Sequence, residues 1–170
     1  MNEAAIVVCT WLHLVVLVIW VGHMVNALIL FGPLASKHVN QNSYGDFIAD
    51  YRRRDRPVAL GCIAIFLITG LFLTLLNEQY TGLGQVFSNS WSAVLFAKHI
   101  LVLAMIVLGI YQGTRVMPKL AEAAKKATRK EDSRKDVSVE SLEKVRLRVT
   151  QMLCALSMAV LLLTAIGETI

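Results

Sequence analysis

Two histidines, His13 and His99, are the residues of this sequence best suited to metal or cofactor chemistry. Each lies in a long run of apolar side chains that contains few or no charged residues, with His13 inside Trp11–Pro33 and His99 inside 91–113. Ionisable and metal-binding side chains are costly in hydrocarbon, so their presence in such a run indicates a functional site. Imidazole nitrogens are common ligands of haem iron and also suit copper.

Four apolar segments must position these histidines, and each is long enough to cross a membrane. We predict spans at about 5–34, 57–77, 91–113 and 149–168. A span needs ~20 residues at 1.5 Å per residue to cross ~30 Å of hydrocarbon. With 56% apolar and 17% charged residues, the chain is too apolar for a soluble domain. Backbone polar groups in lipid must be satisfied internally. The expected fold is therefore all-α, a single integral membrane four-helix bundle.

The basic residues predict the orientation of this bundle. Of the 17 lysines and arginines, all but Lys98 lie in two segments, 35–57 and 115–148. Basic loops face the cytoplasm, so we expect the connections 35–56 and 114–148 to be cytoplasmic. The protein is then expected in the inner (cytoplasmic) membrane, with both termini on its outer side. This distribution explains the net charge of +5 without a nucleic-acid partner. The lipid bilayer is the expected partner of the remaining surface.

The two histidines are predicted to lie at the same depth. His13 follows Ile6 by seven residues and His99 follows Trp91 by eight, so each is ~10–12 Å inside its span. Both spans run from outside to inside. We interpret the pair as the axial ligands of one haem b in the outer leaflet. Lys98 could bind a haem propionate, and Trp20, two helical turns after His13, could wall the ring.

Other interpretations of these residues stay open. His23 lies ~15 Å deeper than His13 and could bind a second iron or act as a hydrogen-bonded interior residue. Copper is the rival metal, because Cys9 and His13 are spaced i, i+4 and a thiolate with an imidazole suits Cu(I). The histidines could also only hydrogen-bond between helices. The three cysteines (Cys9, Cys62 and Cys154) suggest no disulfide and are interpreted as small core residues.

Several short motifs resemble a known family. They are Trp11-Leu-His13, Trp20-Val-Gly22-His23, Gly32-Pro33 and Lys98-His99-Ile-Leu-Val-Leu. This pattern resembles the copper-resistance D-type (CopD) family and the HemJ-type protoporphyrinogen oxidases, which share a four-helix core. The HemJ-type resemblance implies haem b on His13 and a functional role for Lys98. The CopD-type resemblance implies copper uptake across the inner membrane.

These observations predict a b-type cytochrome. A haem with two histidine ligands has no open coordination position, so electron transfer to or from a quinone or a partner redox subunit is favoured over oxygen chemistry. Related oxidation of a porphyrinogen would make the protein an oxidoreductase. The alternatives are a copper-uptake or copper-resistance membrane protein and a non-catalytic assembly subunit. A homo-oligomer or a place in a larger membrane complex is compatible with each.

Overall fold

The computed structural model describes residues 3–31, 41–76, 90–129 and 133–167, and all of them are helical. The elements in chain order are α1 (Glu3–Asn26), the π-helical turn η1 (Ala27–Phe31), α3 (Gln41–Leu76), α4 (Ser90–Tyr111), the π-helical turn η3 (Gln112–Val116), α5 (Met117–Arg129) and α6 (Ser133–Gly167). Four helices are long and apolar enough to cross a membrane. The predicted all-α, four-span architecture is thus confirmed.

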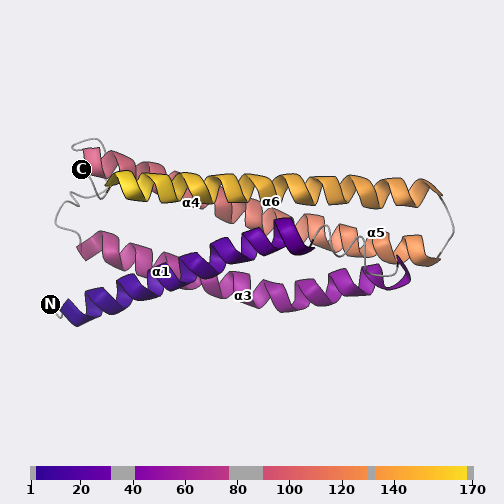
Figure 1. Ribbon diagram of the computed structural model, residues 1–170, viewed down its shortest axis with the longest axis horizontal. Helices are drawn as coiled ribbons and strands as arrows, with labels where there is room; N and C mark the ends of the chain where they lie inside the picture. Colours follow the sequence, from indigo (N-terminus) through magenta and orange to yellow (C-terminus); the bar gives the residue numbers. More distant parts are fainter. Residues whose placement is uncertain (1–2, 32–40, 77–89, 130–132, 168–170) are drawn as a thin grey trace.

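The helices form two pairs that lie side by side (Figure 1). Helix α1 packs on α3, and α4 packs on α6, while α5 continues α4 and contacts both α3 and α6. We call the end where α1 begins and α6 ends the terminal end. The opposite end, where α3 begins and α5 ends, is called the basic end. His13 and His99 belong to the terminal half, one in each pair.

Helix α3 is longer than the sequence predicts. We expected a polar connection over 35–56 and a helix starting at Pro57, but α3 already begins at Gln41 and Pro57 lies inside it. A proline inside a helix removes one backbone hydrogen bond and costs about 3 kcal/mol. Tyr44, Ile48 and Tyr51 follow one another at helical spacing and pack with the buried residues of α5. This tertiary contact explains why the helix continues through the proline.

Helix α6 also extends far toward the basic end. We expected the charged segment 114–148 to be a connection that contains two helical pieces, broken at 133–138. The two helical pieces are there, as α5 and the first half of α6, but residues 133–138 belong to α6. The Gly32-Pro33 pair, where the sequence predicts a kink, lies outside the described residues. So does the predicted loop 78–90, except for Ser90, which is the first residue of α4.

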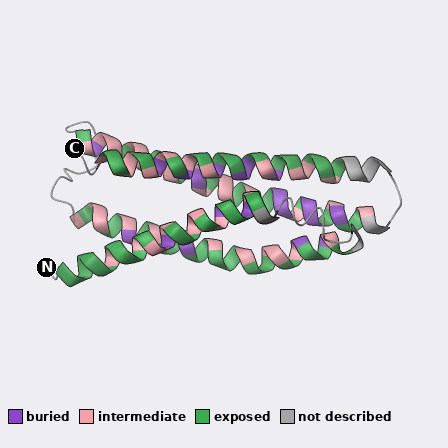
Figure 2. Cartoon of the chain, in the orientation of Figure 1, coloured by how far each residue is buried: buried purple, intermediate pink, exposed green. Residues whose placement is uncertain are grey.

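Burial differs between the two ends of the bundle (Figure 2). Large apolar side chains of the spans are widely exposed, for example Val18 (71%) and Ile68 (69%). In lipid, the burial of apolar side chains between helices gives no hydrophobic stabilisation. Apolar side chains that face outward are therefore expected in the spans. At the basic end, Ile48, Met117 and Leu120 form a buried apolar cluster. The basic end therefore packs like a water-soluble helical protein.

Candidate functional site

A cavity of about 310 Å³ lies between the two helix pairs in the terminal half of the bundle. His13 of α1 and His99 of α4 both line it, and so does Lys98. Its wall includes Trp91, near the start of α4, and Gly167, the last residue of α6. The cavity thus reaches the terminal end. Most of its other wall residues are apolar, and the volume lies at the lower end of the range typical of small-ligand sites.

His13 is held in one tautomer by a threonine that the sequence did not single out. The Nδ1 atom of His13 lies 2.7 Å from the Oγ1 atom of Thr69 in α3, and Thr69 Oγ1 donates to the carbonyl oxygen of Ile65 at 2.7 Å. A hydroxyl has a single proton to donate. Since that proton goes to Ile65, the hydroxyl accepts from His13 Nδ1–H. The Nε2 atom of His13 then carries a lone pair that can bind a metal.

The ring of His13 is also fixed sterically against α3. It stacks on Phe66 with ring centroids 4.1 Å apart and an angle of 30° between the planes. One turn after Phe66, a Cβ atom at Gly70 would lie 3.3 Å from His13 Cε1. The glycines at 61 and 70 predict close approach between helices, and at Gly70 this is confirmed. At Gly61, where we expected the same, a Cβ atom would meet no other atom within 4 Å.

His99 reaches the same tautomer by a different route. Its Nδ1 atom lies 2.7 Å from the carbonyl oxygen of Leu95, one turn earlier in α4. A carbonyl oxygen only accepts, so Nδ1 donates and Nε2 keeps its lone pair. Metal-binding histidines almost always donate their other ring N–H in this way. His99 is exposed and His13 is half-buried. Both histidines line one cavity, and in each of them Nε2 is the nitrogen that remains available to bind a metal.

The other predicted site residues have different surroundings. Lys98 is half-buried on the cavity wall. In the described part of the chain, Trp20 lines a smaller neighbouring cavity and does not line this one. The Nε2 atom of His23 lies 3.0 Å from Oδ1 of Asp55, so it is hydrogen-bonded within the α1–α3 pair. Cys9 donates to the carbonyl oxygen of Thr69 at a sulfur–oxygen distance of 3.7 Å, away from the cavity wall.

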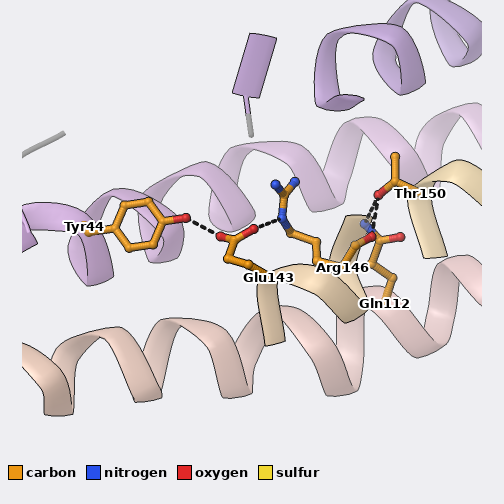
Figure 3. A network of polar contacts seen from close by, with 5 residues as sticks. All are labelled: Tyr44, Gln112, Glu143, Arg146 and Thr150. Atoms are coloured by element: carbon orange, nitrogen blue, oxygen red, sulfur yellow. Dashed lines mark hydrogen bonds and ion pairs between the residues drawn. The ribbon is translucent and has the colours of Figure 1, made fainter. Parts of the chain in front are cut away.

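A buried polar network occupies the basic end, where we expected a solvated connection (Figure 3). Arg146 has only 2% of its side chain exposed, and its Nε donates to Glu143 Oε2 at 2.8 Å. The hydroxyl of Tyr44 donates to the other carboxylate oxygen of Glu143. Gln112 donates to Thr150, which in turn donates to the carbonyl oxygen of Arg146. Tyr44 and Glu143 are about a hundred positions apart, so local sequence patterns could not have paired them.

The number of metal-binding side chains limits which ions or cofactors the site can hold. Within residues 3–31, 41–76, 90–129 and 133–167 there is no group of three or more His, Cys, Asp and Glu side chains that could hold a metal ion. The two imidazoles of the cavity therefore supply at most two protein ligands of this kind. Such a donor pair suits an ion held by two ligands or an iron whose other ligands come from a porphyrin.

Comparison with known families identifies the chain. The family model "Copper resistance protein D" matches residues 52–167, which is more than half of the sequence. The chain belongs to the copper resistance protein D family. The match runs from α3 through α6 and contains Lys98 and His99, whereas His13 lies before it. Among curated proteins and solved structures nothing matches significantly. With its four apolar helices, this member of the family is a multi-pass membrane protein.

Proposed function

We propose that this protein handles copper, which binds as cargo in the cavity of the terminal half, with Nε2 of His13 and of His99 as its ligands. The observation that carries the proposal is the matched tautomer of the two histidines. Both rings donate Nδ1–H to fixed acceptors and both leave Nε2 available on the wall of one cavity. Imidazole is a good copper ligand, and the family's name points to the same metal.

The orientation of the protein gives this site a direction of access. In the described part of the chain, the arginines and lysines of 41–57 and 115–148 lie toward the basic end. Such basic segments face the cytoplasm by the positive-inside rule. The terminal end then faces outward, and the cavity that reaches it takes copper from that side. Lys98 is the electrostatic obstacle to a cation there. Its long flexible side chain can move the ammonium toward the bundle end and so reduce the repulsion.

A haem b is the second candidate, and two features of the cavity favour it. Two Nε2 atoms from different helices suit the axial positions of one iron, and Lys98 suits an anionic propionate. The volume of about 310 Å³ also exceeds what a single ion needs. A haem held here would supply one-electron transfer, for which a quinone or a redox subunit would be the partner. His13, His99 and Lys98 are the residues that would hold it.

The deciding experiment measures both ligands on the same detergent-purified protein. Copper(I) is titrated against a competing chelator, and visible spectra are recorded before and after reduction with dithionite. His13→Gln and His99→Gln should each weaken copper binding strongly. The matched control is His23→Gln, because His23 pairs with Asp55 instead of lining the cavity.

Each outcome separates the candidates. Tight copper binding that depends on His13 and His99, but not on His23, supports the proposal. Sharp haem bands in the reduced protein that disappear in the same two variants would replace copper by haem b. Copper binding that is unchanged by both substitutions, or is equally weakened by His23→Gln, would contradict the assigned ligands. A protein that retains neither copper nor haem would favour a non-catalytic assembly subunit.

A further inference from the structure

A second, much smaller cavity adjoins the first on its inner side. It has a volume of about 40 Å³ and lies among α1, α3, α4 and α6. The two cavities share the wall residues Leu17, Phe66, Leu67, Val102 and Val160. Trp20 and Met105, on the wall of the small cavity, follow His13 and His99 by seven and six residues. At 1.5 Å per residue, the small cavity therefore lies ~10 Å deeper in the membrane.

Two sulfur atoms belong to residues on the wall of this small cavity. Cys62 comes from α3 and Met105 from α4, and they are 8% and 9% exposed. A thiolate and a thioether are soft ligands that select Cu(I). Cys9 and Cys154 are absent from both walls in the described part of the chain. Of the three cysteines, Cys62 is thus the one that lines the small cavity together with a methionine.

The size of the cavity narrows the possible ligands further. A cavity of 10–15 Å³ on this scale holds one water, so about 40 Å³ accommodates a bare ion with little water and excludes a quinone or a porphyrin. The indole Nε1 of Trp20 is buried without a hydrogen-bond partner among the described residues. This indole N–H is therefore available to donate a hydrogen bond to a ligand sulfur or to a water molecule.

We propose that Cys62 and Met105 form a second Cu(I) site, deeper in the membrane than the histidine site and adjacent to it. This inference rests on the proposed copper function. Binding exchanges the thiol proton of Cys62 for the monovalent ion, and the proton leaves to water. The thioether of Met105 adds no charge. The net charge of the small cavity is therefore unchanged by binding, which removes much of the cost of placing an ion among apolar side chains.

The arrangement implies an ordered transfer of copper. The wide cavity at the terminal end can take an ion that still carries water, and the narrow one can take it only after most of that water is lost. A strongly hydrated ion loses more by this step than Cu(I), which gains two sulfur ligands. The pair of cavities thus selects by size and by ligand softness in sequence. The inner site is the one that distinguishes Cu(I) from harder ions.

The test is copper stoichiometry together with copper X-ray absorption, on full-length protein loaded with Cu(I) in detergent. Wild type should hold a second copper equivalent, with sulfur in its coordination shell. Cys62→Ala should lose the sulfur signal and one equivalent. Met105→Leu conserves side-chain volume, so it tests the site even if Cys62→Ala fails to fold, and it should weaken binding of the same equivalent. Cys154→Ala is the matched control and should keep both ions.

The results separate this inference from the proposed function. Copper bound only by nitrogen and oxygen, in one equivalent, would overturn the inner site and leave the histidine site standing. A sulfur signal that survives Cys62→Ala but not Cys9→Ala would assign the sulfur to Cys9 and overturn the inference. Protein that binds no copper would overturn both. If His13→Gln with His99→Gln loses one equivalent and keeps the sulfur-bound copper, both sites are supported. If that variant keeps both equivalents, the inner site stands and the histidine site is overturned.

Discussion

The two ends of the bundle both carry hydrogen-bonded polar side chains, but they use them in opposite ways. At the basic end, the carboxylate of Glu143 lies between the Arg146 guanidinium and the Tyr44 hydroxyl. At the terminal end, His13 and His99 each use one ring nitrogen and leave the other available on a cavity wall. The basic end thus pairs its charges with one another. The terminal end keeps metal-binding nitrogen atoms at a cavity.

This difference separates a structural network from a binding site. A buried charge that already has its partner contributes to stability or fold specificity and offers little to a ligand. An imidazole with a fixed tautomer and an available lone pair contributes little to folding but is ready for a metal. We therefore expect substitutions at the basic end to change stability and substitutions at the terminal end to change binding. Substitutions at both ends test this contrast, beginning with the largest expected effect.

Glu143→Ala should destabilise the protein by about 3–5 kcal/mol, because it leaves Arg146 buried without its carboxylate. The measurement is thermal unfolding in detergent, followed by circular dichroism. The matched control is Glu140→Ala on the same helix, where Glu140 forms an exposed i, i+4 pair with Lys144. That substitution should hardly change the melting temperature. Copper binding per folded chain should be the same in both variants.

The combined substitution of Glu143 and Arg146 by leucine and methionine sharpens this test. Removing both partners leaves no unpaired charge, so the double variant should be more stable than Glu143→Ala. If the double variant is the less stable of the two, the network contributes more than charge pairing and our interpretation is wrong.

Gly45→Ala should destabilise the contact of α3 with α5 by about 1–3 kcal/mol, as overpacking of a filled core does. A Cβ atom at Gly45 would lie 2.6 Å from Cγ and 2.8 Å from the backbone nitrogen of Lys125. The side chain can move, but the backbone must shift. Gly113→Ala is the control, since a Cβ atom there would meet no other atom within 4 Å. Equal melting temperatures for the two variants would contradict the tight packing assigned to the basic end.

These residues also explain how far the sequence could predict the structure. The four spans follow from composition and length, and the shared cavity of His13 and His99 agrees with the equal depth counted from the span starts. The burial of Arg146 was missed because its charge suggests solvent. Its carboxylate partner Glu143 is only three residues away, but Tyr44, which binds the same carboxylate, is about a hundred positions away. Thr69 was missed for a similar reason. A threonine in an apolar span is unremarkable until the facing helix places a histidine beside it.

Thr69→Val should weaken copper binding by about 10- to 100-fold, the usual effect of removing an outer partner of a ligating histidine. Valine has nearly the shape of threonine but offers His13 Nδ1 no acceptor, so the ring is free to change tautomer. Thr69→Ser keeps the hydroxyl and should bind copper nearly as wild type does. Titration of both variants against a competing Cu(I) chelator gives the two affinities. Equal affinities would show that Thr69 does not set the tautomer.

The smallest expected effect comes from Gly70→Ala, and it tests whether ring position matters as well as tautomer. The added Cβ atom would lie 3.3 Å from His13 Cε1, so the imidazole must move by a few tenths of an ångström while its hydrogen bond to Thr69 survives. Alanine in place of glycine favours the helix by about 0.5–1 kcal/mol. Gly61→Ala provides that same gain without a contact. Stability should therefore rise or stay level in both variants, and only Gly70→Ala should lower copper affinity, by less than Thr69→Val does. A loss of the same size in Gly61→Ala would trace the effect to helix stiffness, and unchanged affinity in Gly70→Ala would mean that the cavity tolerates a displaced ring.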